Sequence, residues 1–385
     1  MRQNNKIKRL SLILVVSALI TIILSTAMAI PVSAAGVVPP ATDNCKAFVL
    51  YDKTHDEYVV ERSGYAILNT STSAKIMMGL IACEELEHRL DESVTITAEM
   101  LKGASGYSMK LKEGEVITIR DLLYGAICGS YNDAAYVLAT VVGGSAAGFT
   151  DMMNEKAAKM GLSNTHFENP HGLDGESHYT TAYELALITR EAMANPILRE
   201  ICSTYKKTIP LNETEGVRLL INHNKLLRSY EGAIGVKTGF TKKSGRCLVS
   251  AAERDGLTLI AVTLGAPDDW RDHTAMLDYG FSLYEARTLC DIGSFSYIMP
   301  LSGSDTDHII LENAQKITVI LPRNASEIKC VIELPRFCLA PIKEGDEIGK
   351  LVYYLGGEKI AESAIIAKTG AESTNSNGFW TKIFK

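Results

Sequence analysis

Apolar and polar positions divide the chain into regions of different texture. Residues 1–34 hold a basic start followed by an apolar run from Leu10 to Ile30. Residues 43–286 combine apolar runs of helical length with short alternating runs, which predicts a mixed domain of helices and strands. Residues 290–368 alternate apolar and polar positions over short stretches separated by turns, which predicts a small all-β domain.

Within the mixed domain, short alternating stretches predict strands and longer periodic stretches predict helices. Four strands are expected to form two antiparallel pairs around polar turns: Ala47–Tyr51 with Glu57–Val60, and Cys247–Glu253 with Thr258–Leu264. Further extended segments are Ser93–Thr97, Glu115–Thr118 and Arg218–Ile221. Helices are predicted over Ile119–Cys128, Asp133–Val142, Phe149–Met160, Thr181–Asn195 and Asp269–Glu285.

The N-terminal region has the parts of a secretory signal peptide. Four basic residues precede the apolar run, and Val32-Ser33-Ala34 supplies the small residues of a cleavage site. The alternative is an uncleaved membrane anchor, since the run approaches spanning length. Removal of residues 1–34 takes away four positive charges and no negative one, so the formal net charge falls from −6 to −10. No nucleic-acid partner is expected for so acidic a chain.

The C-terminal segment, residues 369–385, begins polar and ends in an aromatic-rich stretch. On a helix, its apolar side chains would share one side: Phe379, Trp380, Ile383 and Phe384. Such a segment suits a short foot on a membrane surface. A disordered chain end is the competing interpretation.

Cysteine and histidine spacing predicts no metal site. The eight cysteines include no CxxC pair, and a disulfide framework is not expected, although an isolated pair stays open. Cys83, Cys128 and Cys247 lie in apolar stretches and are interpreted as small core residues. His171, His178 and His223 fit no compact metal-ligand spacing and are interpreted as structural.

The stretch from Asn69 to Cys83 carries the first candidate chemistry. Hydroxyl residues occupy positions 70–73 and can cap a helix, and the apolar segment behind them contains one early charge, Lys75. A lysine in a buried helix loses solvation, which favours its neutral form and makes it a candidate base. Thr72 and Ser71 share its helical face at i−3 and i−4. Alone, the stretch equally fits a polar cap followed by a snorkelling lysine.

Two further polar motifs lie among apolar segments. Ser130-Tyr131-Asn132 falls between two predicted helices and, by itself, is typical of a helix–helix turn. Lys237-Thr238-Gly239 follows an extended segment. A lysine and a hydroxyl beside a side-chain-free glycine suit the capture of a carboxylate near a closely approaching backbone. A strand end with a solvated lysine is the plain alternative.

In this order, the three motifs resemble the SxxK, SxN and KTG signature of penicillin-recognising serine acyl-enzymes. Residues 45–368 resemble, in particular, the low-molecular-weight D-alanyl-D-alanine carboxypeptidases. Besides the three motifs, the segments that carry this resemblance are Lys75-Ile76-Met77, Arg120–Gly125, Asp133-Ala134-Ala135, Asn169–Leu173, Asn222–Leu227 and Gly235-Val236.

The resemblance implies a fold, a substrate and a location. The expected fold class is α+β: an antiparallel sheet sandwiched by helices at 43–286, then the small β domain, then an amphipathic C-terminal anchor. The implied enzyme is exported to the extracytoplasmic cell surface and removes the terminal D-alanine from peptidoglycan stem peptides that end in D-Ala-D-Ala. It would be inhibited covalently by β-lactams and would need no metal or organic cofactor.

The resemblance also assigns catalytic roles. A hydroxyl attacks the carbonyl of the D-Ala–D-Ala bond with Lys75 as general base, and Ser130 relays a proton to the leaving amine. Asn132 holds the substrate amide. The middle residue of this motif is usually small in the family. Here it is Tyr131, which is expected to narrow the cleft.

Substrate-binding roles follow from the third motif. Lys237 and Thr238 are expected to bind the terminal carboxylate. The oxyanion is expected between the nucleophile's own N–H and the N–H of Phe240, the residue after Gly239. The predicted site therefore draws on segments that are far apart in the sequence.

The nucleophile position departs from the family pattern. Family members have serine three residues before the motif lysine, whereas this chain has Thr72 there and Ser71 one residue further back. Ser73 is excluded because i+2 points to another side of a helix. The register favours Thr72 with slow or absent turnover. Ser71 is the alternative, since the extra methyl of threonine crowds its approach to a carbonyl.

Two functions follow from this departure. The first is an active acyl-enzyme carboxypeptidase. The second is a catalytically impaired homologue that binds cell-wall peptides without turnover. A β-lactamase is less expected, because the chain carries an extra β domain and has no clear deacylating glutamate motif after Ser130.

Overall fold

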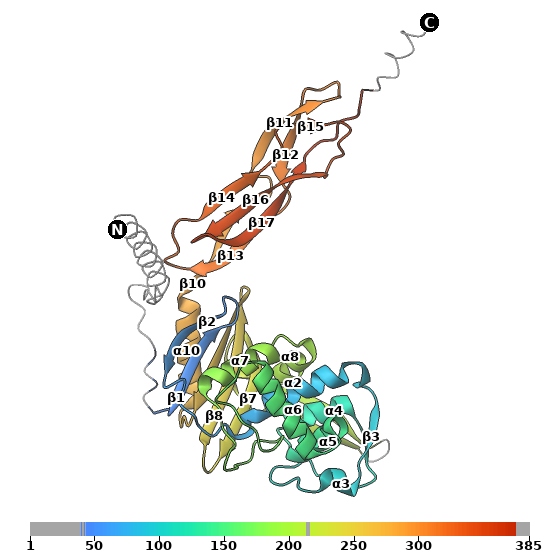
Figure 1. Ribbon diagram of the computed structural model, residues 1–385, viewed down its shortest axis with the longest axis vertical. Coiled ribbons are helices and arrows are strands. Elements are labelled where there is room, and N and C mark those ends of the chain that lie inside the picture. The colour runs from blue at the N-terminus through green and yellow to red at the C-terminus, as the bar shows by residue number, and fades with distance from the viewer. Residues whose placement is uncertain (1–39, 41, 43, 213–215, 375–385) are drawn as a thin grey trace, which may run out of the picture. The chain divides into compact units, whose positions relative to one another are not determined.

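The computed structural model describes residues 40, 42, 44–212 and 216–374. The predicted signal peptide and the aromatic end of the tail lie outside the described residues. The first folded region contains a five-stranded antiparallel sheet in the order β2-β1-β9-β8-β7 (Figure 1). Its strands are β1 (Ala47–Asp52), β2 (Glu57–Arg62), β7 (Ala233–Thr241), β8 (Gly245–Arg254) and β9 (Leu257–Leu264).

The two predicted strand pairs are confirmed, because β1 pairs with β2 and β8 with β9. The central strand β9 is buried at every position, as expected for a strand covered on both faces. By contrast, β7 has a single strand neighbour, β8, and so forms an edge of this sheet. The third motif lies on that edge.

Helices cover both faces of the sheet, which confirms the predicted α+β fold class. α10 packs with β8 and β9 in one hydrophobic cluster, and α2 and α7 pack with the other face of the same strands. The helices are η1 (Ser71–Ala74), α2 (Lys75–Leu86), η2 (Glu87–Arg89), α3 (Ala98–Leu101), α4 (Ile119–Ile127), α5 (Asn132–Gly143), α6 (Ala146–Lys159), α7 (Ala182–Ala192), α8 (Pro196–Ser203), α9 (Leu226–Ser229) and α10 (Asp269–Ser282). Two short antiparallel pairs accompany them: β3 (Ser93–Thr95) with β4 (Val116–Thr118), and β5 (Lys206–Asn212) with β6 (Gly216–Ile221).

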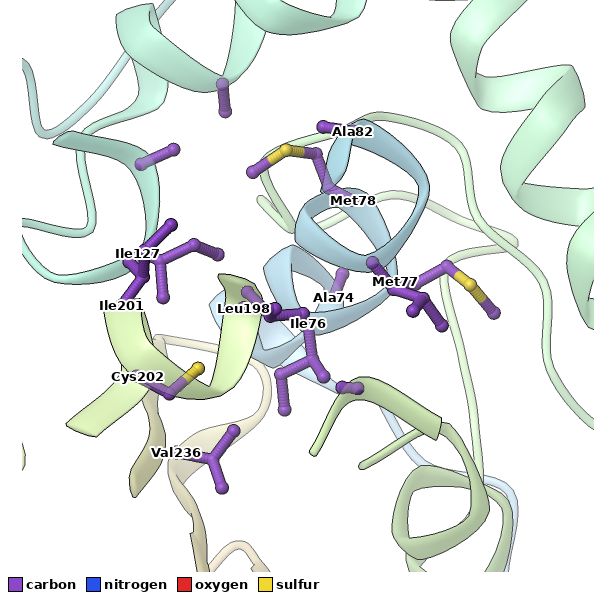
Figure 2. Packing of buried hydrophobic residues seen from close by; sticks show 14 of the residues in the cluster. Ala74, Ile76, Met77, Met78, Ala82, Ile127, Leu198, Ile201, Cys202 and Val236 are labelled. Atoms are coloured by element: carbon purple, nitrogen blue, oxygen red, sulfur yellow. The ribbon is translucent and has the colours of Figure 1, made fainter. Parts of the chain in front are cut away.

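The helix α2 runs through the main core, as its apolar sequence predicts. All its residues are buried except Glu84 and Glu85. Figure 2 shows its side chains among Ile127 of α4, a group from α8 and Val236 of β7. Cys83 and Cys128 also lie buried as free thiols, as expected. A lysine at the start of this helix is therefore held in an apolar interior.

Two predicted helices end earlier than expected. The predicted helix Thr181–Asn195 ends at Ala192, and α8 starts separately because Pro196 occupies its first turn and Asn195 caps it by accepting the N–H of Leu198 at 3.0 Å. The prediction that α10 reaches Glu285 is also wrong. Tyr284–Cys290 instead forms a strand, β10, that pairs with β13.

The second folded region is all-β, as predicted. One sheet has the order β14-β16-β17-β12-β11-β15, and β10 pairs with β13. Its strands are β10 (Tyr284–Cys290), β11 (Ser296–Ser302), β12 (His308–Asn313), β13 (Ile317–Pro322), β14 (Lys329–Glu333), β15 (Cys338–Leu339), β16 (Glu347–Leu355) and β17 (Glu358–Ala367). Inward side chains of these strands form a cluster of their own.

Candidate active site

The hydroxyl-rich segment forms the 3₁₀ turn η1, which leads directly into α2. Ser71 has a φ of 58°, a left-handed conformation that costs energy in a residue other than glycine. The hydroxyls of Ser71 and Ser73 are buried and have no hydrogen-bond partner among the described residues. The side chain of Thr72 lies outside the described residues.

Gly239 lets η1 pack closely against β7. A Cβ at Gly239 would lie 2.9 Å from both Ser71 Oγ and Ser73 Oγ, which is closer than real Cβ contacts come. The third position of the KTG motif therefore has to be glycine for this approach. The contact joins the first and third predicted motifs at one point, as the sequence predicts.

Lys75 is fully buried at the start of α2. Its Nζ donates to Asn132 Oδ1 at 2.7 Å and to the backbone oxygen of His171 at 2.8 Å. Burial, followed by the nearby charge of Lys237, lowers the pKa of Lys75 well below its ordinary value. A neutral amine has two N–H groups and one lone pair. With both N–H groups directed to these acceptors, the lone pair is left to accept a proton.

The second motif lies between α4 and α5 and brings two polar groups to the same place. Ser130 has a φ of 60°, and Asn132 is the first residue of α5. Asn132 Nδ2 donates to the backbone oxygen of Ser105 at 2.6 Å, while its Oδ1 accepts from Lys75. Both ends of this amide are therefore fixed by the loop on one side and the buried lysine on the other.

Lys237 on β7 is also buried, at 2% exposure. Its Nζ donates to Ser130 Oγ at 2.8 Å and to the backbone oxygen of Thr238 at 3.0 Å. Burial lowers the pKa of Lys237 to about 8. The hydroxyl of Ser130 accepts this hydrogen bond, so its own proton can be donated elsewhere.

The turn containing His171 contributes to the site through its backbone. Asn169 holds the turn by accepting the N–H of Gly172 at 2.7 Å. The carbonyl of His171 then meets Lys75, while its ring packs beside Tyr136 with centroids 5.0 Å apart. Burial, and then Lys75, lowers the pKa of His171 to about 3. Histidine spacing did not reveal this role. The sequence signal that pointed to this turn was the Asn169–Leu173 segment, which is part of the family resemblance.

A cleft of about 520 Å³ opens above these buried groups. The predicted residues that line it are Ser130, Asn132, Thr238, Gly239 and Phe240. Ser71, Lys75 and Lys237 lie beneath its surface. Sequence reasoning missed its other lining residues, which are Tyr107, Leu173, His223, Lys225, Arg246, Cys247, Asp269 and Trp270.

Tyr131 and His223 differ from their sequence interpretations. Tyr131 is not among the lining residues of the cleft. Its ring stacks on Tyr107, with centroids 4.8 Å apart, and Tyr107 forms that wall. His223 was interpreted as structural, but its exposed side chain lines the cleft and meets the edge of Tyr107 at 5.8 Å. An aromatic wall therefore borders the Ser130 end of the cleft.

Fold and site together define an acyl-transfer enzyme of the SxxK, SxN and KTG class: the three motifs meet beside one cleft on the edge strand of a helix-covered antiparallel sheet. A model of the D-alanyl-D-alanine carboxypeptidase family matches residues 35–268, and a model of the C-terminal domain of penicillin-binding protein 5 matches residues 284–373. The chain belongs to the D-alanyl-D-alanine carboxypeptidase family.

Relatives and solved structures agree with this assignment. The D-alanyl-D-alanine carboxypeptidase DacF of Bacillus subtilis is 30% identical over 352 residues, which cover 88% of this chain and 90% of the relative. The structure of DacD from Francisella tularensis is 26% identical with a TM-score of 0.61, covering 88% of this chain and 96% of that one. Penicillin-binding protein 5 from Haemophilus influenzae is 25% identical with a TM-score of 0.63, covering 88% of this chain and all (100%) of that one.

Proposed function

We propose that this chain is a serine-type D-Ala-D-Ala carboxypeptidase that removes the terminal D-alanine from peptidoglycan stem peptides. The observation that carries the proposal is Lys75: a buried amine with both N–H groups held by Asn132 and His171, under a cleft that contains Ser130 and Thr238. Such an amine is a base ready to take a proton from a hydroxyl. The alternative, a relative that binds without turnover, is not favoured by the comparisons.

In the proposed mechanism, a hydroxyl of η1 attacks the carbonyl carbon of the D-Ala–D-Ala bond and gives its proton to Lys75. An ester forms to the enzyme and the C–N bond breaks. Ser130 passes a proton to the leaving D-alanine amine, and water then hydrolyses the ester to free the shortened peptide and the enzyme hydroxyl. Asn132 holds the substrate amide, and the N–H of Phe240 helps to bind the oxyanion.

Lys237 and Thr238 are proposed to bind the terminal carboxylate of the substrate. Lys237 lies just beneath the cleft, where its amine bonds to Ser130 Oγ and to the backbone oxygen of Thr238, and Thr238 itself lines the cleft. Both residues belong to an edge strand along which an extended peptide can lie. A β-lactam presents the same pair of features, a reactive carbonyl and a carboxylate. It is therefore expected to acylate the same hydroxyl.

We propose that Thr72 supplies the attacking hydroxyl. The hydroxyls of Ser71 and Ser73 are closed off behind Gly239, at 1% and 0% exposure, and neither residue lines the cleft. Of the hydroxyls adjacent to Lys75 that the sequence offered, Thr72 is left by this elimination. The strained backbone at Ser71, immediately before it, is the kind of feature that clusters at active sites.

The proposed function is tested by two measurements on the purified protein. A fluorescent penicillin should label the chain covalently, and a peptide ending in D-Ala-D-Ala should lose one D-alanine per molecule. Labelling without release would support the binding-only alternative. Absence of both would overturn the proposal.

The pH dependence of acylation should reveal the state of Lys237. We expect kcat/KM for penicillin acylation to fall as the pH rises through about 8, the pKa to which burial lowers Lys237. Above this pH the amine loses the charge that holds the carboxylate, and kcat/KM reports groups of the free enzyme. The nearby thiols do not titrate in this pH range, because burial raises the pKa of Cys128 to about 11 and that of Cys202 higher still.

Lys237→Ala is the control for this profile. It should lower acylation at neutral pH and remove the falling limb, because no titrating cation is left at the carboxylate. A wild-type profile that stays level across the range would remove Lys237 from the carboxylate site. So would an alanine variant that is acylated at the wild-type rate.

We propose that the enzyme acts outside the cytoplasm after cleavage of residues 1–34. The support is the basic start, the apolar run and Val32-Ser33-Ala34. N-terminal sequencing of the exported protein should therefore begin near Ala35, and an intact Met1 form in the membrane would replace cleavage with a signal anchor. In the described part of the chain, no helix is long and apolar enough to cross a bilayer. The proposed membrane foot at 378–385 lies outside that part.

A further inference from the structure

The cleft extends beyond the catalytic motifs toward α10. Lys225, Arg246 and Trp270, here called the cationic lobe, line the cleft together with Thr238. The same three residues also line a second cavity of about 400 Å³. The two hollows are therefore neighbours that share one wall, and the space next to Thr238 continues past the three motifs to Trp270.

The cationic lobe lies on the leaving-group side of the site. Cross-strand partners point to the same face of a sheet. Thr238 pairs with Leu248, which belongs to the cluster beneath α10, whereas Lys237 pairs with Val249 in the cluster around α2. Arg246 pairs with Phe240, two residues beyond Thr238, so it lies on the α10 face as well. A carboxylate bound at Thr238 belongs to the leaving residue, and the lobe is the space beside that residue.

The charges of the lobe leave one cation available for a ligand. Arg246 is held by Asp269, with Nη2–Oδ1 and Nε–Oδ2 distances of 2.8 and 3.1 Å, and its guanidinium lies 5.8 Å from the ring centre of Trp270. Lys225 is exposed, and its Nζ lies 5.9 Å from the centre of the same ring. Among the described residues Lys225 has no carboxylate partner within ion-pair distance, whereas Asp268 is paired with Arg271 at 3.1 Å.

We propose that this lobe binds a second carboxylate on the leaving group, so that the enzyme also releases acidic D-amino acids from acyl-D-Ala–D-Xaa bonds. Lys225 makes the ion pair and Trp270 supports the aliphatic part of the side chain, while Arg246, neutralised by Asp269, packs beside the Trp270 ring. The chemistry is unchanged: the C–N bond breaks, the ester forms, and the acidic amine leaves with the proton from Ser130. This inference rests on the proposed function.

The test compares three peptides that differ only in the leaving residue: D-Ala, D-Glu and D-Gln. D-Glu and D-Gln have the same shape and the same terminal carboxylate, so their ratio of kcat/KM isolates the second charge. Wild type should prefer D-Glu by roughly three- to fivefold, the size expected of an exposed ion pair beside an aromatic ring. In Lys225→Gln the ratio should fall to about one. Lys242→Gln, which removes an exposed lysine that does not line the cleft, should keep the wild-type ratio.

The outcomes separate this inference from the proposed function. If D-alanine is released but D-Glu and D-Gln behave alike, the lobe has no such role and the carboxypeptidase stands. If no peptide is cleaved, the proposed function fails, and the role of the lobe is then tested by measuring how tightly the D-Glu and D-Gln peptides bind. The chain has two tryptophans, so Trp380→Phe leaves Trp270, beside Lys225, as the sole tryptophan whose emission can be excited selectively. Tighter binding of the D-Glu peptide than of the D-Gln peptide then supports the lobe, and equal binding overturns it.

Discussion

Replacing Lys75 with methionine is expected to reduce penicillin acylation by about 10²- to 10⁴-fold, the range that general-base catalysis supplies. Methionine fills much of the same space but has no lone pair on nitrogen to take the hydroxyl proton. The variant leaves Asn132 Oδ1 and the carbonyl of His171 without their buried donor, which costs roughly 1–3 kcal/mol for each group left unpaired. It also removes the desolvation cost of a buried amine, so the fold should persist.

The measurement pairs labelling rates with a thermal unfolding curve for each variant. Lys159→Met is the matched control, because that side chain is 75% exposed on α6 and its replacement should change the free energy of unfolding far less. It should label at the wild-type rate. Wild-type labelling by a folded Lys75→Met protein would show that another group activates the hydroxyl, and the mechanism proposed above would have to be abandoned.

The parts of this site that the sequence predicts are those encoded within a few residues. Lys75 stands out because it is the first charge in an apolar stretch, and the burial of α2 confirms that this stretch is an interior helix. Lys237-Thr238-Gly239 stands out because it joins a cation, a hydroxyl and a glycine at a strand. The hairpin of β1 and β2 follows from alternation on either side of a polar turn.

The parts that the sequence does not predict depend on contacts between distant segments. The carbonyl of His171 reaches Lys75 across 96 residues of chain, and a backbone oxygen leaves no mark on residue type. The predicted helix extended to Glu285, but the chain from Tyr284 forms a strand that pairs with β13, and strand formation depends strongly on such partners. The cationic lobe was missed because Lys225, Arg246 and Trp270 come from three separate segments.

Thr72→Ala is expected to abolish penicillin labelling, whereas Ser71→Ala should retain it. Both hydroxyls lie within one turn of Lys75 in the sequence, but the structure closes the Ser71 hydroxyl behind Gly239 at 1% exposure and gives it no hydrogen bond to Lys75. A nucleophile must reach a carbonyl in the cleft, and an error of about 1 Å in that approach can cost on the order of a hundredfold in rate. Ser73→Ala is the matched control for loss of a buried hydroxyl at Gly239, and it too should label.

Thr72→Ser should label faster than the wild type, because serine lacks the methyl group that stiffens χ1 and crowds the carbonyl. Mass mapping of the labelled peptide would place the acyl group on residue 72. Loss of labelling in Ser71→Ala alone would move the nucleophile back by one residue and contradict the assignment. If the wild type never labels while folded Thr72→Ser does, the threonine itself limits the chemistry. The natural chain would then be a member of its family whose cleft and base are intact, but whose nucleophile is impaired.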